Sequence, residues 1–381
     1  MNVPLYKQIY ETILQKIQIG ELIQGDKIPS EKELADEFQV SRITSKKALD
    51  LLAQEQIIER VQGKGSFVIY SVEEPDNMLN SNQTFNTKKG LKIGLVIPSF
   101  ASSYGMALVQ SIEYSGSKYG VNLLMKITRE KIEEEENAIE ELLDAGVDGL
   151  IVIPIHGEHY NPKILELVLK KFPIVLVDRY LRGIQASAVL TDNVRASKEA
   201  TEYLMSLGHE HIAYITPAYD GTTALEDRLK GYQLAHNEQH KQLNPDFIFT
   251  NYGSDFAFNK QRKLEFELEI ENMRNFILNY PEITAFVACR HAFAKILLYV
   301  IQSIGKTVPQ DYSIICFDSP HPIIGKPLIT HISQRENEMG ARAVKRLMSQ
   351  INGEYTIETE LLNFKLIEGL STAPIKTPVK N

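Results

Sequence analysis

The sequence predicts an α/β protein in which a small, mostly helical head precedes a larger body with two parallel sheets. Helical patterns dominate residues 1–70, whereas short apolar segments alternate with helical stretches after residue 90. The predicted strands number about a dozen, which is too many for one sheet of usual size. The clearest apolar segments, predicted as buried parallel strands, are residues 91–98, 121–127, 147–154, 172–178, 211–216, 283–289 and 311–318.

The chain has 381 residues, too many for a single core of ordinary size. Residues 71–90 are rich in Asn, Ser and Thr and show little periodicity, which is typical of an interdomain linker. We therefore predict a head domain over residues 1–70, a linker over residues 71–90, and a body over residues 91–381.

Composition limits the compartment and the kind of partner. The net charge of −8 argues against unspecific binding of nucleic acid by the whole molecule. The sequence lacks a membrane-length apolar stretch and an apolar signal-peptide core, so we expect a cytoplasmic protein. Cys289 and Cys316 lie in apolar segments, which predicts buried free thiols instead of a disulfide or a cysteine metal site.

The strongest acidic cluster covers residues 129–146 and allows two interpretations, a cation or acidic partner site and a solvated amphipathic helix. Ile132, Ile139, Leu142 and Leu143 give the segment an apolar face, which favours the helix.

Motifs typical of enzymes are missing from the sequence, which has no nucleophile elbow, phosphate loop, dinucleotide glycine pattern or HExxH. We therefore expect a protein that is not an enzyme, with no catalytic residues, no metal and no cofactor. An exported binding protein is disfavoured because a signal segment is missing and the head is present. A body that serves only oligomerisation, without a ligand, remains an alternative.

Capping signals define the helices of the head. A first helix is predicted to end at Gly20. Ser30 and Glu33 form a capping box for a short helix that ends near Phe38. After a tight turn, Ser41 is predicted to cap the next helix. These two helices with a short turn between them predict a helix-turn-helix.

The second of these helices has the properties of a recognition helix. Arg42, Thr44, Ser45 and Lys46 are expected near its exposed N-terminal end, where the helix dipole and polar side chains can reach bases and phosphates. The following segment, IIERVQGKGSFVIY, predicts two strands joined by Gly63, Lys64 and Gly65. A hairpin with a basic tip beside a helix-turn-helix is a wing.

Residues 4–68 closely resemble the GntR-type winged-helix head over its full length. The resemblance implies a dimer on a two-fold operator, with Arg42 on a guanine edge, basic side chains on the phosphate backbone, and the wing near the minor groove. This family usually has an apolar residue where Ser45 stands and Arg where Lys46 stands. The candidate DNA-binding residues are Ser30, Glu31, Ser41, Arg42, Thr44, Ser45, Lys46, Lys47, Gln62, Gly63, Lys64 and Gly65.

Residues 91 to about 372 resemble the LacI/GalR effector domain, which has the two-lobed periplasmic-binding-protein fold. The resemblance runs through LKIGLVIPSF, FPIVLVDRY, LTDNVRASKEATEYLMSLGHEHIAYI, VPQDYSIICFD and LITHISQRENEMGARAVKRL. It implies a sugar-like ligand held between the lobes at the carboxyl ends of parallel strands. The combination of head and body is similar in architecture to the arabinose repressors of Gram-positive bacteria.

Family positions carried onto this sequence imply roles for individual side chains. Tyr104 would stack on the sugar ring, and Arg228 and Asp318 would bind its hydroxyls. Arg179 and Asp192 would lie near the crossover between lobes, where a structural bond and a ligand contact are both open. The candidate ligand-binding residues are Ser99, Ser102, Tyr104, His156, Arg179, Asp192, Arg228, Arg290 and Asp318.

Two departures concern this pocket. Arg290 and His291 stand where the family usually has Asn-Asp, and His156 stands where a carboxylate can follow the strand. Because arginine binds phosphate or carboxylate bidentately, these changes favour a sugar phosphate or sugar acid. The alternative is that Arg290 points to solvent or pairs with a neighbouring acid.

The expected mechanism is that of a homodimeric repressor of carbohydrate-utilisation genes. Ligand would close the lobes and weaken operator binding. A regulator that is independent of ligand or is co-repressed by a small anion remains the alternative, and no membrane partner is expected.

Overall fold

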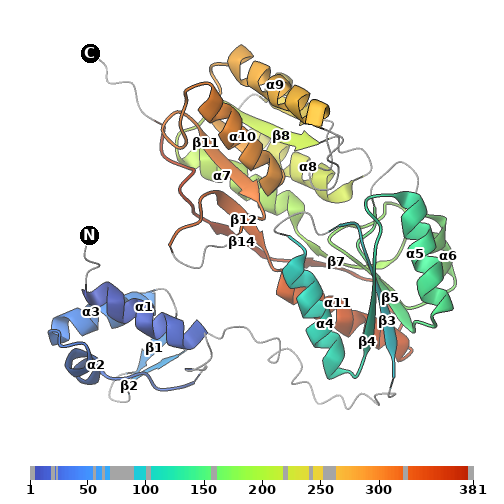
Figure 1. Cartoon of the computed structure of the whole chain (residues 1–381), viewed down its shortest axis with the longest axis horizontal. Helices are drawn as coiled ribbons and strands as arrows, with labels where there is room; N and C mark the ends of the chain where they lie inside the picture. Colours follow the sequence, from blue (N-terminus) through green and yellow to red (C-terminus); the bar gives the residue numbers. More distant parts are fainter. Residues whose placement is uncertain are drawn as a thin grey trace. The chain divides into compact units, whose positions relative to one another are not determined.

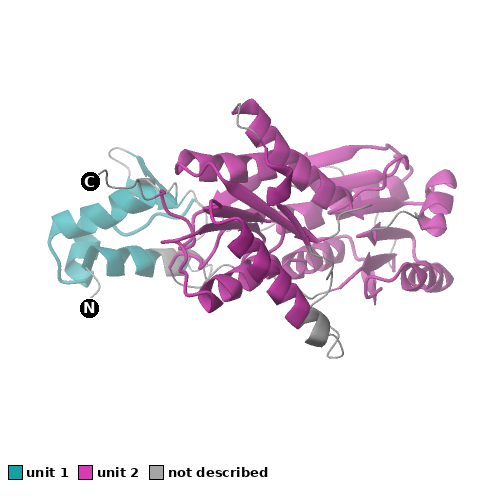
Figure 2. Cartoon of the chain, turned by 90° about the horizontal axis from the view of Figure 1, so that it is seen from above, with its two compact units in different colours: residues 1–85 teal, residues 86–381 magenta. Residues whose placement is uncertain are grey.

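The computed structural model describes residues 5–18, 22, 25–54, 57–61, 65–68, 90–99, 104–155, 161–217, 222–239, 243–251, 263–320 and 325–375. The chain divides into two compact units, residues 1–85 and residues 86–381 (Figure 2).

The head consists of three helices and a two-stranded antiparallel sheet (Figure 1). Helices α1 and α2 both pack against α3, and the core between them includes Ile9, Leu34, Leu49 and Leu52. The elements are α1 (Leu5–Gln18), α2 (Glu31–Glu37), α3 (Arg42–Gln54), β1 (Ile58–Val61) and β2 (Gly65–Val68).

Two six-stranded sheets form the larger unit. The first has the order β13-β7-β6-β5-β3-β4 and the second β14-β12-β11-β10-β8-β9. All neighbouring strands are parallel except the antiparallel pair β12 and β14, so the predicted fold class is confirmed. The strands are β3 (Lys92–Ile97), β4 (Asn122–Ile127), β5 (Gly149–Val152), β6 (Ile174–Val177), β7 (Ser187–Thr191), β8 (Ile212–Pro217), β9 (Ile248–Asn251), β10 (Ala285–Ala288), β11 (Ser313–Phe317), β12 (Thr330–Gln334), β13 (Thr359–Leu362) and β14 (Phe364–Ile367).

Each sheet and its helices form one lobe with its own hydrophobic core. Helix α11 follows β12 of the second sheet but packs against α4 and the strands of the first sheet, as Figure 1 shows. The helices are α4 (Met106–Lys118), α5 (Ile132–Asp144), α6 (Pro162–Leu169), α7 (Asn193–Ser206), α8 (Thr223–Glu238), the 3-10 helix η2 (Pro245–Phe247), α9 (Lys263–Asn279), α10 (His291–Ser303) and α11 (Glu336–Ile351).

The chain crosses between the lobes three times, after β7, after β12 and after β13. Because the strands are parallel, their carboxyl ends bring the residues that follow them to one edge of each sheet. The crossing segments therefore lie beside the residues that follow β6 and β11.

All seven apolar segments contain a strand of these sheets, as predicted. Strand β4 differs from the prediction in burial: it is the edge strand of its sheet, and none of its side chains is buried. Cys289 and Cys316 are buried free thiols, which confirms that prediction. Among the described residues, no helix is long and apolar enough to cross a membrane.

The acidic segment forms α5, whose Ala138, Ile139 and Leu142 are buried, so the amphipathic helix is confirmed. Glu135 of the same helix is also buried, which the pattern did not predict. Its carboxylate accepts hydrogen bonds from the Ile155 N–H at 2.8 Å and from Asn161 Nδ2 at 2.7 Å. Burial nevertheless raises the pKa of Glu135.

Candidate functional site

The helix-turn-helix begins with the predicted capping box. Ser30 Oγ accepts a hydrogen bond from the Glu33 N–H at 3.3 Å, and the Ser30 N–H donates to Glu33 Oε2 at 2.7 Å. At the start of α3, Ser41 Oγ accepts a hydrogen bond from the Thr44 N–H at 3.2 Å. Both predicted caps are therefore present, and they fix the N-terminal ends of α2 and α3.

The N-terminal turns of α3 expose most of the candidate DNA contacts. Ser41, Arg42, Lys46 and Lys47 are exposed, and Lys47 Nζ lies 4.1 Å from the ring centre of Tyr6. Ile43 is 80% exposed, an unusual position for a large apolar side chain. Sequence reasoning missed Ile43, although an apolar residue next to Arg42 at a recognition helix N-terminus is suited to contact a thymine methyl group.

Ser45 requires a correction, because its side chain is fully buried and does not lie at the exposed end of α3. Its hydroxyl donates to the carbonyl oxygen of Glu31 at 2.7 Å and to that of Arg42 at 3.1 Å. Ser45 therefore joins α2 to α3. The Glu31 carboxylate pairs with Arg60, which also pairs with Asp50, so these groups form an ion-pair cluster within the head.

At the wing, Gln62, Gly63 and Lys64 lie outside the described residues, whereas Gly65 is exposed and begins β2. Gly65 has φ of +122°, and a Cβ there would lie 2.6 Å from Lys27 Cε. The Lys27 side chain is flexible and can move away, so it is the left-handed backbone conformation that favours glycine at this position.

In the body, two aspartates occupy equivalent positions in the two lobes. Asp178 follows β6 and Asp318 follows β11, with φ of +68° and +61°. The Asp178 N–H donates to Val189 O at 3.1 Å, and the Asp318 N–H donates to Ile332 O at 3.0 Å. Left-handed backbone at a non-glycine residue is uncommon and concentrates at functional sites. The fold therefore has a left-handed aspartate, bonded through its N–H to the next strand, at the end of both β6 and β11.

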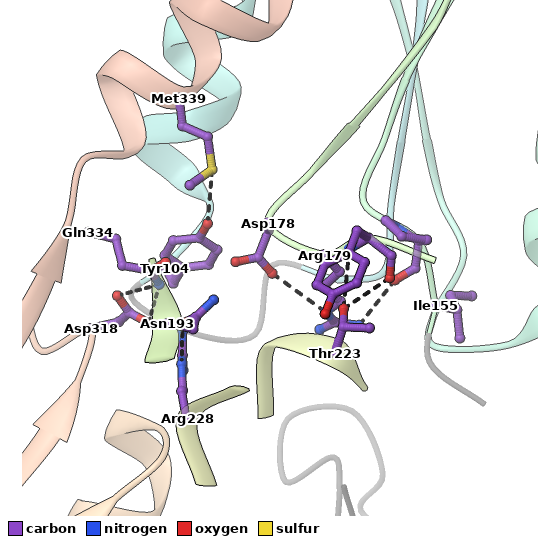
Figure 3. Close-up of polar contacts among 12 residues, drawn as sticks. Tyr104, Ile155, Asp178, Arg179, Asn193, Thr223, Arg228, Asp318, Gln334 and Met339 are labelled. Atoms are coloured by element: carbon purple, nitrogen blue, oxygen red, sulfur yellow. Dashed lines mark hydrogen bonds and ion pairs between the residues drawn. The ribbon is translucent and has the colours of Figure 1, made fainter. Parts of the chain in front are cut away.

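Asp318 and Arg228 lie in a network of buried hydrogen bonds (Figure 3). Gln334 Nε2 donates to both carboxylate oxygens of Asp318 at 2.9 Å. Arg228 donates from Nε to Asn193 Oδ1 and from Nη1 to Cys289 O, both at 2.7 Å. Its guanidinium carbon lies 3.9 Å from the ring centre of Phe317. Burial raises the pKa of Asp318 to about 6, although the charge of Arg228 opposes the shift.

Tyr104 and Glu336 extend this network toward the first lobe. The Tyr104 hydroxyl lies 3.5 Å from Met339 Sδ on α11 (Figure 3). Burial, together with the charges of Asp178, Asp318 and Glu336, raises the pKa of Tyr104 well above its usual range. Burial also raises the pKa of Glu336 to about 7. The residues that the fold brings together at this point, here called the interlobe cluster, are Tyr104, Asp178, Arg179, Asn193, Arg228, Asp318, Gln334 and Glu336.

Arg179 and Asp192 both make structural bonds. Arg179 Nε lies 3.5 Å from Asp178 Oδ2, and its Nη1 donates to Pro154 O at 3.3 Å. Asp192 Oδ1 accepts from the Arg195 N–H at 3.0 Å and caps α7. Asp192 also lines a surface cavity of about 250 Å³ between β7, β13 and α7. Arg179 belongs to the interlobe cluster, whereas Asp192 lies at its margin.

Four other candidates, Ser99, Ser102, His156 and Arg290, are not joined to this network by a hydrogen bond among the described residues. Arg290 directly precedes α10 and is partly buried, and Ser99, two residues after β3, is also partly buried. Burial lowers the pKa of His291, the first residue of α10, to about 4. Ser102 and His156 lie outside the described residues.

Sequence reasoning missed Asp178, Asn193, Gln334 and Glu336. Asp178 carried a usable signal, because an aspartate that ends the apolar segment LVD matches the FD at Asp318. Gln334 ends β12 and Glu336 begins α11, at a crossing whose sequence pattern does not reveal that it passes through a site.

The head and the interlobe cluster together define a class of protein: a DNA-binding regulator whose second unit can bind a small polar ligand between two lobes. Comparison with known families agrees. Residues 5–68 match the gntR family of bacterial regulatory proteins. Residues 90–243 match the periplasmic binding proteins and sugar binding domain of the LacI family, and residues 201–372 match the periplasmic binding protein-like domain.

Similar sequences include two arabinose metabolism transcriptional repressors. The one from Halalkalibacterium halodurans is 30% identical over 353 residues, which cover 92% of this chain and 90% of that protein. The one from Geobacillus stearothermophilus is 28% identical over 358 residues, 92% of each chain. The protein therefore belongs to the family of transcriptional repressors that join a GntR-type head to a LacI-type effector domain, and both resemblances predicted from the sequence are confirmed.

Solved structures share the fold of the body. The regulator CcpA of Lactococcus lactis superimposes with a TM-score of 0.63 at 24% identity over 74% of this chain and 100% of that chain. A LacI family regulator from Enterococcus faecium with bound ribose gives 0.61 at 25% identity, over 75% of this chain and 100% of that chain.

Proposed function

We propose that this protein represses carbohydrate-utilisation genes and leaves its operator when a sugar or sugar derivative binds the interlobe cluster. The observation that carries the proposal is the convergence of Arg228, Asp318 and Tyr104 with residues of the crossing segments. Planar charged groups and an aromatic ring suit a polyhydroxylated ligand. Relatives named as arabinose metabolism repressors and a related regulator with bound ribose support a sugar as effector.

The mechanism depends on the crossing segments. A ligand that contacts Arg228 and Asp318 from one lobe and Tyr104 from the other favours one relative position of the lobes. Because Gln334 ends β12 and Glu336 begins α11, a change at this crossing reaches α11 and the first lobe. Operator affinity then differs between the effector-free and the effector-bound protein, because binding at the two sites is thermodynamically coupled.

We propose a cytoplasmic homodimer, associated through its effector domains, on a two-fold symmetric operator. Exposed apolar side chains on α4 and β4 support the dimer: Tyr114 is 39%, Met125 43% and Ile127 37% exposed. Strand β4 is also an edge strand of its sheet. Exposed apolar surface and an open strand edge favour association. Sedimentation of the full chain over a concentration range measures the oligomeric state.

The experiment that tests the function uses the full chain and an operator selected by it from random DNA. Monosaccharides, sugar acids and sugar phosphates are screened by thermal shift, and those that stabilise the protein are added to gel shifts. We expect at least one to raise the melting temperature and release the DNA. Tighter DNA binding with ligand would instead indicate a co-repressed regulator. No stabilisation by any sugar would contradict ligand sensing and favour a body that serves only oligomerisation.

A further inference from the structure

Three arginines from both lobes approach one region of the site. Arg179 follows β6 of the first lobe, Arg228 lies on α8 of the second lobe, and Arg290 lies between β10 and α10 of the second lobe. Residues that follow parallel strands gather at the carboxyl edge of their sheet, which places Arg179 and Arg290 at these edges. Arg228 lies in the first two turns of α8 and reaches the same region through its contact with Cys289.

Hydrogen bonds hold these segments together. Thr223, the first residue of α8, donates its hydroxyl to Tyr180 O at 3.0 Å and accepts from the Tyr180 N–H at 3.2 Å. This pair joins the segment containing Arg179 to the helix that carries Arg228 (Figure 3). In turn, Arg228 Nη1 donates to the carbonyl oxygen of Cys289, the residue before Arg290. The three guanidinium groups therefore belong to one neighbourhood that spans both lobes.

The three arginine side chains differ in their bonding partners. Arg228 is bound by Asn193 and Cys289 and packs on Phe317, and Arg179 lies against Asp178 and Pro154 O. The carbonyl oxygen of Arg290 accepts hydrogen bonds from the first turn of α10, whereas its guanidinium has no hydrogen bond or ion pair with the described part of the chain. Burial lowers the pKa of Arg290, the charges of Arg179 and Arg228 add to this shift, and the charge of Glu130 opposes it. Because a buried cation whose charge is not fully balanced is costly, an anion between these groups would be stabilised.

The same cluster also holds carboxylates, and the charges of Arg228 and Arg290 both act on Asp318. Asp318 and Glu336 are carboxylates near the Tyr104 hydroxyl, and the charge of Asp318 helps to raise the pKa of Glu336. Carboxylates accept hydrogen bonds from sugar hydroxyls but repel an anion. A ligand that satisfies both the carboxylates and the arginines carries hydroxyls together with a single anionic group.

We propose that the effector is a sugar that carries one carboxylate or phosphate group, and that this group binds between Arg179 and Arg290 and draws the two lobes together. The proposal rests on the proposed function, because it names the ligand class for the same site. Arginine binds both anions bidentately, and Arg179 and Arg290 come from different lobes, so one anionic group can contact both. The repulsion between the two cations then becomes attraction to a shared anion, and this favours closure.

The test compares matched ligands by calorimetry with the full chain. The pairs are D-glucose with D-gluconate, D-galactose with D-galacturonate, L-arabinose with L-arabinonate, and D-glucose with glucose 6-phosphate. We expect the charged member of at least one pair to bind ten-fold or more tightly than the neutral member, with the advantage falling as salt rises from 50 to 300 mM. The acid and phosphate arms separate the two sources of negative charge.

Variants of Arg290 test whether this side chain binds the anionic group. Arg290→Gln is expected to weaken the charged ligand ten-fold or more and to leave the neutral one within two-fold, whereas Arg290→Lys falls between. Lys295→Gln removes a charge from an exposed position on the same helix and serves as the control. The inference would be overturned if a neutral sugar bound more tightly than its acid and phosphate and if Arg290→Gln had the same ligand affinities as the wild type. That result would leave the proposed function intact. No binding by any sugar overturns both.

Closure is measured separately. Leu169 in the first lobe is 74% exposed and Leu278 in the second is 56% exposed, so Leu169→Cys with Leu278→Cys accepts a fluorophore pair while the native cysteines stay buried. We expect the charged ligand to change energy transfer in this protein and not in its Arg290→Gln derivative. The same change in both proteins would show that closure does not depend on Arg290.

Discussion

Glu336, the first residue of α11, accepts a hydrogen bond from the Gly105 N–H at the start of α4, with Oε2 2.7 Å from the nitrogen. The same oxygen lies 3.4 Å from the Leu108 nitrogen. The carboxylate thus caps α4 from the segment that crosses between lobes, where the helix dipole favours its charge. Burial and the nearby Asp318 oppose that charge and raise the pKa of Glu336 to about 7.

Because burial and Asp318 raise the pKa of Glu336, the stability of the folded protein is predicted to depend on pH. A glutamate whose pKa is higher in the folded than in the unfolded state stabilises the fold fully below about pH 4.5, and this contribution is lost as pH rises through about 7. Glu336→Gln keeps an acceptor for Gly105 but does not titrate. We therefore expect its unfolding free energy, relative to the wild type, to increase between pH 5 and pH 8 in urea denaturation. Glu113→Gln, at an exposed position on α4, is the control, and parallel pH curves for wild type and Glu336→Gln would contradict the assignment.

Arg228 is predicted to matter for stability as well as for binding. The sequence resemblance predicts that Arg228→Ala removes effector binding without unfolding the protein. In the structure this side chain is 4% exposed and binds Asn193 and Cys289 O, so truncation leaves a cavity and unpaired polar atoms. We expect a loss of about 2–4 kcal/mol in unfolding free energy together with the loss of effector binding. Denaturation and calorimetry on the same sample measure both, and an Arg228→Ala variant with wild-type effector affinity would remove Arg228 from the site.

The fold was predictable where burial follows from composition. The seven clearest predicted strands are apolar segments, and six of them are buried, because parallel strands covered on both faces need apolar side chains; the exception is the edge strand β4. Strand β12 was not found, since Thr330 and His331 are fully buried but polar. Thr330 is satisfied by distant partners, its N–H by Ser371 and its hydroxyl by Thr372. Hydrophobic periodicity does not detect a strand of this kind.

The site was predictable only in part, for a related reason. The family resemblance brought Tyr104, Arg228 and Asp318 into consideration, and the structure places them together. Glu336 could not be found because its role depends on α11 returning to the first lobe beside α4. Ser45 carried an overlooked signal: the family usually has an apolar residue there, which indicates a buried position.

Ser45 leads to a prediction for the head. Its hydroxyl donates to Glu31 O and Arg42 O from a fully buried position, so Ser45→Ala removes a bond between α2 and α3. We expect a loss of about 1 kcal/mol in the stability of the head, which a typical buried hydrogen bond contributes. Operator affinity measured well below the melting temperature should change less than three-fold. A larger loss of affinity without a loss of stability would indicate that Ser45 contacts DNA.

Truncation of Arg42 is predicted to have the opposite effect: a large loss of operator affinity and little loss of stability. Arg42 is exposed at the first turn of α3, and its side chain has no ion-pair or hydrogen-bond partner among the described residues, so its truncation costs the fold little. If Arg42 reads a guanine in each half of a two-fold operator, Arg42→Ala should weaken binding to the selected operator by about 100-fold or more. Unspecific binding to random DNA should fall much less, because it depends on the phosphate contacts that remain.

The matched control is Arg274→Ala, which removes the same charge from α9 of the larger unit. Fluorescence anisotropy with labelled operator at two salt concentrations separates the loss of a base contact from the loss of a phosphate contact, because only the second reduces the salt dependence. Stabilisation of Arg42→Ala by effector should match that of the wild type, since the effector binds the other unit. Wild-type operator affinity in Arg42→Ala would exclude this residue from base recognition and place specificity elsewhere on α3, with exposed Ile43 as the next residue to test.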